Sequence, residues 1–375
     1  MNLFNVYPLY DITPVKAQGS SLWDENGVKY TDLYGGHAVI SIGHSHPHYV
    51  QKITEQVKNI AFYSNSVQIP LQKELADKLG ELSGLDDYSL FLANSGAEAN
   101  ENALKLASFY TGRKKIIAFK KGFHGRTSAA VAATDNPGIK APINFDSHVQ
   151  FLPYNDVEAV RAAVDDETCA VIVEGIQGIG GIHVGTDEFM RAIRDSCDKH
   201  GAIFIHDSVQ CGYGRSGKFF TSEFSGVRPD IISMAKGMGN GFPIGGILIA
   251  PKFESKYGML GTTFGGNHLA CAAGIAVLDV IKEENLIQNA AELGEYLMTE
   301  LKSINGIKEL RGKGLMVGIE MEQPIKAIRE GMLFEDHIFT GVAGANTIRL
   351  LPALSVGKTE IDLFLESFRK RVSAM

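Results

Sequence analysis

Short, unbroken apolar runs alternate with helical patterns between about residues 70 and 280, and this alternation constrains the fold most strongly. Unbroken apolar strands are buried on both faces, which is typical of parallel sheets covered by helices. We therefore expect an α/β fold with a mostly parallel central sheet and helices on both faces. The expected strands are Ser89–Ala93, Lys115–Phe119, Val149–Leu152, Cys169–Val173, Ala202–Ile205, Ile231–Ala235 and Gly246–Ala250.

The two ends of the chain have a different pattern. Residues 1–45 contain short strands and turns around Trp23, whereas residues 280–375 begin with a long helical pattern after Asp279 and continue through a strand at Gly314–Met321. Neither end has enough apolar residues for a core of its own. We expect both ends to form one smaller α+β domain beside a large domain of residues 46–279.

Composition and charge favour small-molecule chemistry. The 375 residues include 36 Lys and Arg against 43 Asp and Glu, a net charge of −7, and no basic run. This balance disfavours nucleic acid and anionic membrane partners. The N-terminus lacks a signal-peptide pattern, and the apolar run Leu269–Leu278 is too short to span a bilayer. We expect a cytoplasmic protein with reduced thiols and no C-x-x-C pair among Cys169, Cys197, Cys211 and Cys271.

Polar residues follow several of the expected strands directly. Glu174, Asp207 and Lys236 each stand at such a strand end, and Asn94-Ser95-Gly96-Ala97-Glu98 follows another. Ligands of open α/β sheets bind at the carboxyl ends of the strands. These side chains are therefore expected to converge on one ligand.

Ser95 and Glu98 have the Ser-x-x-Glu spacing of a helix capping box, ahead of a helical pattern at Ala97–Tyr110. A plain N-cap is one interpretation of this spacing. The other is a phosphate site, because Gly96 would let an anion approach the N–H groups at the positive end of the helix. The motif alone leaves both open.

Lys236 precedes a glycine-rich loop, Gly237-Met238-Gly239-Asn240-Gly241. A lysine at a strand end is usually only a solvated charge. Apolar flanks would instead desolvate the ammonium, lower its pKa and make the amine nucleophilic. Asp207, buried by its strand, needs either a structural partner or a cation such as a protonated pyridine nitrogen.

These motifs, in this order, resemble the class III (ornithine-type) aminotransferases, pyridoxal-phosphate enzymes of fold type I. The resemblance covers nearly the whole chain, and the N-acetylornithine/N-succinylornithine aminotransferases of arginine biosynthesis match most closely. It rests on Gly43-His44-Ser45-His46-Pro47, Asn94-Ser95-Gly96-Ala97-Glu98-Ala99, Phe123-His124-Gly125-Arg126-Thr127, Asp207 and Gln210 ahead of Gly212-Tyr213-Gly214-Arg215-Ser216-Gly217, Lys236 with its glycine loop, Thr262-Thr263-Phe264-Gly265-Gly266-Asn267, and Arg311-Gly312-Lys313-Gly314.

The resemblance implies a role for each matching residue. Lys236 would bind pyridoxal 5'-phosphate covalently and shuttle the proton, and Asp207 would keep the pyridine nitrogen protonated. The rest of the cofactor site would be Ser95, Gly96 and Ala97 at the phosphate, Phe123 against the ring, Gln210 at the ring hydroxyl, and Thr263 supplied by the second subunit of a homodimer.

The resemblance also implies a substrate site. Arg126 resembles the clamp for the donor carboxylate, and Arg349 resembles the clamp for the α-carboxylate of glutamate and 2-oxoglutarate, with Glu174 nearby. A guanidinium suits this task because it binds a carboxylate through two hydrogen bonds. Tyr34 to Val39 would line the substrate channel. The histidines His37, His44, His46, His48 and His124 lack metal-ligand spacing, and we expect no metal.

The chain departs from the family pattern in the stretch Glu174-Gly175-Ile176-Gln177-Gly178-Ile179-Gly180 and again at Ser208. Ser208 replaces a glutamate beside the cofactor. Ile179 replaces the glutamate that usually pairs with the residue equivalent to Arg349. An unpaired, desolvated arginine should recruit a carboxylate, either from a ligand or from a neighbour such as Glu174. This favours a succinylated donor over an acetylated one.

The sequence therefore predicts an aminotransferase that moves the δ-amino group of an N-acylornithine to 2-oxoglutarate. Ornithine, 4-aminobutyrate and N-acyl-diaminopimelate are alternative donors. A non-catalytic, phosphate-binding regulatory protein of the same fold is an alternative of another class, although Lys236 argues against it.

Overall fold

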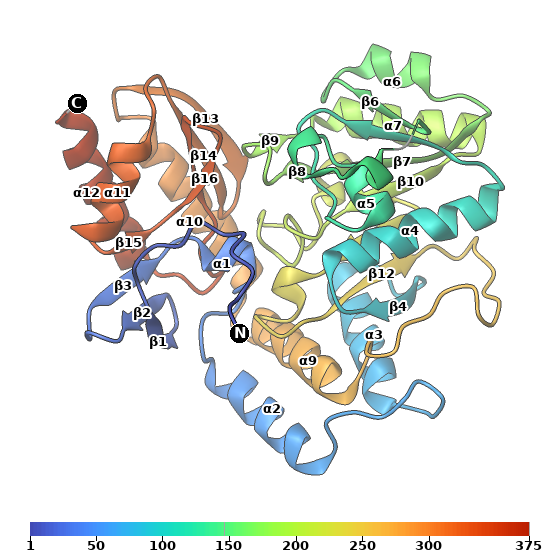
Figure 1. The fold of residues 1–375 in the computed structure, drawn as a ribbon, viewed down its shortest axis with the longest axis horizontal. Coiled ribbons are helices and arrows are strands. Elements are labelled where there is room, and N and C mark those ends of the chain that lie inside the picture. The colour runs from blue at the N-terminus through green and yellow to red at the C-terminus, as the bar shows by residue number, and fades with distance from the viewer. Residues whose placement is uncertain (146, 375) are drawn as a thin grey trace.

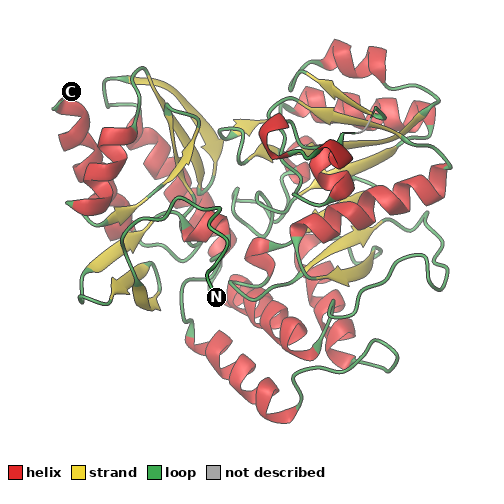
Figure 2. Ribbon diagram, viewed as in Figure 1, coloured by secondary structure: helices red, strands yellow, loops and turns green. Residues whose placement is uncertain are grey.

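The computed structural model describes residues 1–145 and 147–374. The largest sheet of this part of the chain has seven strands and lies among helices in the right half of Figure 2. Strand β12 runs antiparallel to both of its neighbours, and the other pairs are parallel. The expected mostly parallel sheet is thus confirmed. Its strands, in spatial order, are β4 (Ser89–Ala93), β12 (Gly245–Ile249), β11 (Ile231–Met234), β10 (Ile203–Asp207), β7 (Thr168–Glu174), β5 (Lys115–Phe119) and β6 (Val149–Leu152).

Helices cover both faces of this sheet, as strand β7 illustrates. Ala170 and Ile172 pack in one apolar cluster with residues of α4 (Gly96–Thr111). Val171 and Val173 pack in another cluster with residues of α7 (Asp187–His200). Successive side chains of a strand point to opposite faces, so an unbroken apolar run is the pattern that two covered faces require.

The helix α9 (His268–Glu283) packs against α2 (Pro47–Asn59) and α3 (Pro70–Ser83). It contains the apolar run Leu269–Leu278 and is buried along most of its length. Within the described residues, no helix combines the length and apolar character needed to cross a bilayer. The remaining helical elements of this part of the fold are α5 (Ser128–Ala132), α6 (Val157–Ala163), α8 (Ser222–Ser225), η1 (Pro137–Ile139), η2 (Pro142–Asn144) and η3 (Lys236–Met238).

The two ends of the chain lie together beside the central sheet, on the left of Figure 1. Strand β3 pairs in parallel with β15, which joins residues from opposite ends of the sequence. The first of the two small sheets holds β1 (Pro14–Gln18), β2 (Ser21–Asp24), β3 (Lys29–Asp32) and β15 (Ile338–Phe339), and the second holds β13 (Ile307–Lys313), β14 (Met316–Met321), β17 (Thr347–Leu350) and β16 (Gly341–Ala343).

The helix expected immediately after Asp279 is placed wrongly. Asp279 lies inside α9, and the next helix, α10, spans Leu286–Leu301. The predicted domain boundary at residue 280 therefore falls within a helix, and the division into two domains stays a prediction. The other elements are α1 (Gly35–Ala38), α11 (Lys326–Phe334), α12 (Lys358–Ser373), β8 (Ile176–Gln177) and β9 (His183–Val184).

Candidate active site

A cavity of about 430 Å³ lies where strands β7 and β10 end and where the chain leaves β11. This volume is within the usual range for small-molecule sites. Within the described residues, every predicted site residue except Thr263 and Arg349 lines the cavity. Those lining residues are Ser95, Gly96, Ala97, Phe123, Arg126, Glu174, Asp207, Gln210 and Lys236.

Lys236 follows β11 and begins η3 with a left-handed backbone, φ 46°. Burial lowers the pKa of its amine, and the charge of Arg349 lowers it further, against the opposing effect of Asp207 and Glu174. The amine has no hydrogen-bond partner in the described part of the chain. A desolvated amine with a lowered pKa is a better nucleophile, because more of it is unprotonated at neutral pH.

Asp207 ends β10 and is held by three donors. One carboxylate oxygen accepts hydrogen bonds from Asn100 Nδ2 and His124 Nδ1, both at 2.8 Å, and the other accepts one from Val209 N at 3.0 Å. Burial favours the neutral acid, but the bond to His124 and its charge outweigh this and lower the pKa of Asp207. A carboxylate can accept about four hydrogen bonds, so Asp207 retains capacity for a donor in the cavity.

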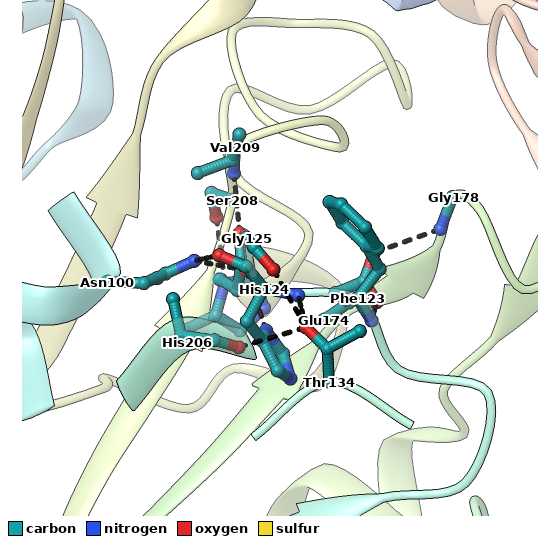
Figure 3. Close-up of polar contacts among 12 residues, drawn as sticks. Asn100, Phe123, His124, Gly125, Thr134, Glu174, Gly178, His206, Ser208 and Val209 are labelled. Carbon is teal, nitrogen blue, oxygen red and sulfur yellow. Dashed lines mark hydrogen bonds and ion pairs between the residues drawn. The ribbon is translucent and has the colours of Figure 1, made fainter. Parts of the chain in front are cut away.

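His124 is the functional neighbour that sequence reasoning missed. On the sequence alone, His124 had no assigned role and was grouped with the histidines that lack metal-ligand spacing. In the structure, its imidazole is buried against Asp207. Burial lowers the pKa of His124, but the hydrogen bond and charge of Asp207 raise it overall. Figure 3 shows His124 next to Asn100 and Phe123. The one sequence signal was its position directly after Phe123 in a matched motif.

Glu174 ends β7, and its carboxylate holds two backbone segments of the cavity wall. Its oxygens accept hydrogen bonds from Phe123 N at 2.9 Å and Gly178 N at 3.0 Å, as Figure 3 shows. Burial, and then the charge of Asp207, raises the pKa of Glu174 to about 7. Glu174 therefore titrates in the neutral range, and its role in substrate binding stays a prediction.

Ser95 is the N-cap of α4, since its hydroxyl accepts a hydrogen bond from Glu98 N at 3.2 Å. Glu98 bonds back to Asn94 N at 2.6 Å rather than to the cap residue. Capping and anion binding are compatible here, because Gly96 and Ala97 also face the cavity. A Cβ at Gly96 would approach Val209 to 2.6 Å, so this position requires glycine.

Gln210 lines the cavity and has an unused acceptor. Its amide nitrogen donates to the His37 carbonyl at 3.1 Å, whereas its buried Oε1 has no partner among the described residues. The site thus offers a nucleophilic amine, a carboxylate, a free acceptor and the open end of a helix. These groups fit the aldehyde, ring nitrogen, ring hydroxyl and phosphate of pyridoxal phosphate.

The two arginines predicted to bind substrate differ in exposure. Arg126 is exposed on the cavity wall and forms no ion pair with any described residue. Arg349 is 2% exposed and donates to the carbonyls of Gly178 at 3.0 Å and Val342 at 2.9 Å. Arg349 and Glu174 form no ion pair in the described structure, and each oxygen of Glu174 accepts from a backbone amide instead.

The departure at Ser208 belongs to a buried neutral network. Its hydroxyl lies 2.7 Å from His206 Nδ1, and His206 Nε2 lies 3.1 Å from Thr221 Oγ1. Burial lowers the pKa of His206 to about 4, so its ring is neutral. A Cβ at Gly175 would collide with Thr221 and approach His206, so the packing around this network favours glycine there.

Two predictions concern the rim of the site. Of residues 34–39, which the sequence predicted to line a substrate channel, Val39 alone lines the cavity, and the channel stays a prediction. Thr263 is exposed between β12 and α9 and does not line the cavity of its own chain. Its contribution to the site of a second subunit stays a prediction.

Comparison with known proteins also identifies an aminotransferase. Residues 5–372 match the family model described as aminotransferase class-III. An acetylornithine aminotransferase of Vibrio vulnificus (strain YJ016) is 40% identical, covering 98% of this chain and 95% of its own. One of Archaeoglobus fulgidus is 38% identical, covering 97% and 96%.

Solved structures share the fold. An ornithine aminotransferase from Toxoplasma gondii superposes with a TM-score of 0.90 at 28% identity, covering 98% of this chain and 91% of that one. A further structure of that enzyme, at 27% identity, is described with pyridoxal phosphate at partial occupancy in its active site. The chain described here therefore belongs to the class III aminotransferases, the pyridoxal-phosphate-dependent family of fold type I.

Proposed function

We propose that the protein transfers the δ-amino group of an N-acylornithine to 2-oxoglutarate, which yields the N-acylglutamate semialdehyde and glutamate in arginine biosynthesis. The relatives named acetylornithine aminotransferase support this substrate class. The observation that carries the chemistry is the amine of Lys236, which is partly buried, has a lowered pKa and has no hydrogen-bond partner among the described residues, in a cavity that it shares with Asp207.

The side chains of the cavity have different proposed roles in the reaction. Bound pyridoxal phosphate supplies a carbonyl and an electron-withdrawing ring. Lys236 provides the amine that attaches the cofactor and moves the proton, and its lowered pKa suits both tasks. Asp207 holds a proton at the ring nitrogen, while His124 and Asn100 fix the orientation of its carboxylate.

Two arginines suit the carboxylates of the two substrates. Arg126 stands on the cavity wall without an ion-pair partner in the described residues, and it is the proposed clamp for the donor's α-carboxylate. Arg349 is the proposed clamp for the α-carboxylate of 2-oxoglutarate and glutamate. Guanidinium–carboxylate pairs with two hydrogen bonds are strong and directional, so each clamp would fix the orientation of its substrate.

The acyl group is acetyl or succinyl, and different observations favour each. The names of the curated relatives favour acetyl. Ile179 favours succinyl, because it exposes an apolar surface to the cavity where the family has a negative charge. If a succinyl carboxylate uses this side of the cavity, Ile179→Glu should weaken binding of N-succinylornithine and 2-oxoglutarate more than binding of N-acetylornithine. Equal effects on both donors would reject the succinyl assignment.

We also propose a homodimer in the cytoplasm. Exposed Thr263 would complete the phosphate site of the partner subunit. The cysteines are free and buried, which suits a reducing compartment. Size measurement in solution tests the dimer, and Thr263→Ala should weaken cofactor binding without changing the mass of the particle.

The proposed reaction is tested by following glutamate. Purified holoenzyme supplied with N-acetylornithine or N-succinylornithine and 2-oxoglutarate should release one glutamate for each semialdehyde formed. The Lys236→Ala variant is the control that separates the enzyme from contaminating transaminases. No glutamate with either donor, from protein that retains its cofactor, would contradict the proposal.

A further inference from the structure

Among the described residues, Arg349 donates hydrogen bonds to neutral acceptors only, although the charge of Glu174 opposes the lowering of its pKa. Besides the carbonyls of Gly178 and Val342, the described residues offer it the hydroxyl of Tyr34, at 3.4 Å from Nη2, and no ion pair. A guanidinium has five N–H groups, so two remain for another acceptor. The bond to Tyr34 is the longest of the three and is therefore the easiest to exchange.

Ile179 cannot provide the missing acceptor. It lines the cavity with 40% of its surface exposed and has no polar side-chain atom. Arg349 itself is nearly inaccessible, so an anion reaches it only if a neighbour moves. Among its three partners, Tyr34 is the one that contacts it through a side chain.

The hydroxyl of Tyr34 stands between Arg349 and His37 in a chain of hydrogen bonds. Because a guanidinium only donates, the Tyr34 oxygen accepts from Arg349, and its proton is then available to His37 Nδ1, which lies in close contact. The guanidinium carbon also lies 5.8 Å from the centre of the Tyr34 ring. Gly341 makes room for the ring, since a Cβ there would collide with it.

The backbone fixes His37 in place for this contact. Gly35 and Gly36 have left-handed backbones, and so do His37 and Ala38, with φ between 56° and 68°. Non-glycine residues rarely adopt this conformation. The turn is anchored by Asp32, which accepts from Tyr34 N at 3.0 Å and Gly35 N at 2.8 Å.

Tyr34, which contacts Arg349, and His37, which contacts Tyr34, are both uncharged at neutral pH. Burial, and then the charges of Arg349 and Lys236, lowers the pKa of His37. Burial raises the pKa of Tyr34, against the effect of Arg349 and Arg329. The guanidinium therefore contacts a neutral phenol, which in turn contacts a neutral imidazole, where the family has a glutamate.

We propose that the Tyr34 hydroxyl, oriented by His37, holds Arg349 while no substrate carboxylate is bound and yields it to the α-carboxylate of 2-oxoglutarate or glutamate. Tyr34 is then a specificity-determining residue and His37 a positioning residue. This inference rests on the proposed function, since it assumes that Arg349 binds that carboxylate. When a dicarboxylate binds, Arg349 exchanges its long hydrogen bond to the neutral Tyr34 hydroxyl for an ion pair with the ligand. This exchange should favour binding, because Arg349 has no existing ion pair that must first be broken.

The test uses glutarate, a dicarboxylate that cannot react, titrated into holoenzyme by calorimetry. Tyr34→Phe removes the competing hydrogen bond and should tighten glutarate binding about threefold to tenfold. Ile179→Glu gives Arg349 a charged partner and should weaken binding at least about tenfold. In the Ile179→Glu background, Tyr34→Phe should change little, because Arg349 is already engaged.

Tyr88→Phe is the matched control. It also removes one phenolic hydroxyl, which donates to the Pro229 carbonyl at 2.6 Å and lies outside the cavity, so glutarate binding should not change. His37→Asn tolerates the left-handed backbone and should tighten binding by a smaller factor than Tyr34→Phe. Unchanged or weaker glutarate binding by Tyr34→Phe would overturn the proposal.

Two failures are distinguishable: failure of the proposed competition between Tyr34 and a substrate carboxylate for Arg349, and failure of the proposed function. Wild-type turnover with an N-acylornithine and 2-oxoglutarate reports on the function, and glutarate affinity reports on Tyr34. If the wild type turns over but Tyr34→Phe does not tighten glutarate binding, the proposed function is supported and the role of Tyr34 is rejected. Absence of turnover would reject the function, while the glutarate comparison would still decide whether Tyr34 competes for Arg349.

Discussion

The Nδ1 atom of His124 lies 2.8 Å from an oxygen of Asp207, and both side chains are buried. The pair lowers the pKa of Asp207 and raises the pKa of His124, so the charged forms stabilise each other. Asp207 can therefore remain a carboxylate inside a cavity that would otherwise favour the neutral acid. This is the condition for holding a proton on a cofactor nitrogen.

Removal of His124 should leave a buried charge without its main partner. We expect His124→Leu to lower the free energy of unfolding by about 3 kcal/mol, measured by urea denaturation, because breaking a buried pair costs about 3–5 kcal/mol. The double variant with Asp207→Asn should lose less than the sum of the single variants. Strict additivity would show that the two side chains are not coupled.

Asp207→Asn is nearly isosteric but neutral, so it should impair chemistry more than folding. We expect kcat to fall by a factor of at least about 100, because the ring nitrogen would lose its proton. Cofactor content and melting temperature should be measured on the same preparation. Loss of the fold, with no separate effect on turnover, would instead assign Asp207 a structural role.

Lys236→Ala should lose turnover and still bind the cofactor through the start of α4. Wild-type protein should be yellow, and borohydride should fix the cofactor to the peptide that contains Lys236, as mass spectrometry would detect. The variant should show no such adduct. Transamination at the wild-type rate by Lys236→Ala would refute the assignment of this lysine.

Glu174 predicts a dependence of stability on pH. Because the folded protein raises the pKa of Glu174 to about 7, its contribution to stability is present at low pH and is lost as the pH rises through about 7. The melting temperatures of wild-type and Glu174→Gln holoenzyme should be compared at pH 5 and pH 8. The difference, wild type minus variant, should be smaller at pH 8 by about 2 °C or more. A constant or growing difference would contradict the raised pKa.

Local patterns predicted the central sheet well, and long-range contacts explain what they missed. Strand β7 is buried at every position and contains the unbroken apolar run Cys169–Val173, because both of its faces are covered. Strand β13 was not predicted, because it is an edge strand of mostly polar residues, most of which are only partly buried. The end of α9 was misplaced because this helix is buried nearly all round and has no clear polar face.

The site shows the same contrast. Lys236, Asp207 and Glu174 could be predicted because each follows its own strand, and the ends of neighbouring strands meet. The partner of Asp207 could not, since His124 lies 83 residues away and nothing in its spacing marks the contact. The hydrogen bond between Arg349 and Tyr34 could not be predicted either, because the two residues lie 315 positions apart along the chain.

The most direct test of the account is the specificity constant for a panel of amino donors. Purified holoenzyme should be assayed with N-acetylornithine, N-succinylornithine, ornithine and 4-aminobutyrate, each with 2-oxoglutarate as acceptor. We expect kcat/KM for at least one N-acylated donor to exceed that for ornithine and 4-aminobutyrate by about tenfold or more, a difference of about 1.4 kcal/mol in transition-state binding. A higher kcat/KM for ornithine or 4-aminobutyrate than for both acylated donors would contradict the account.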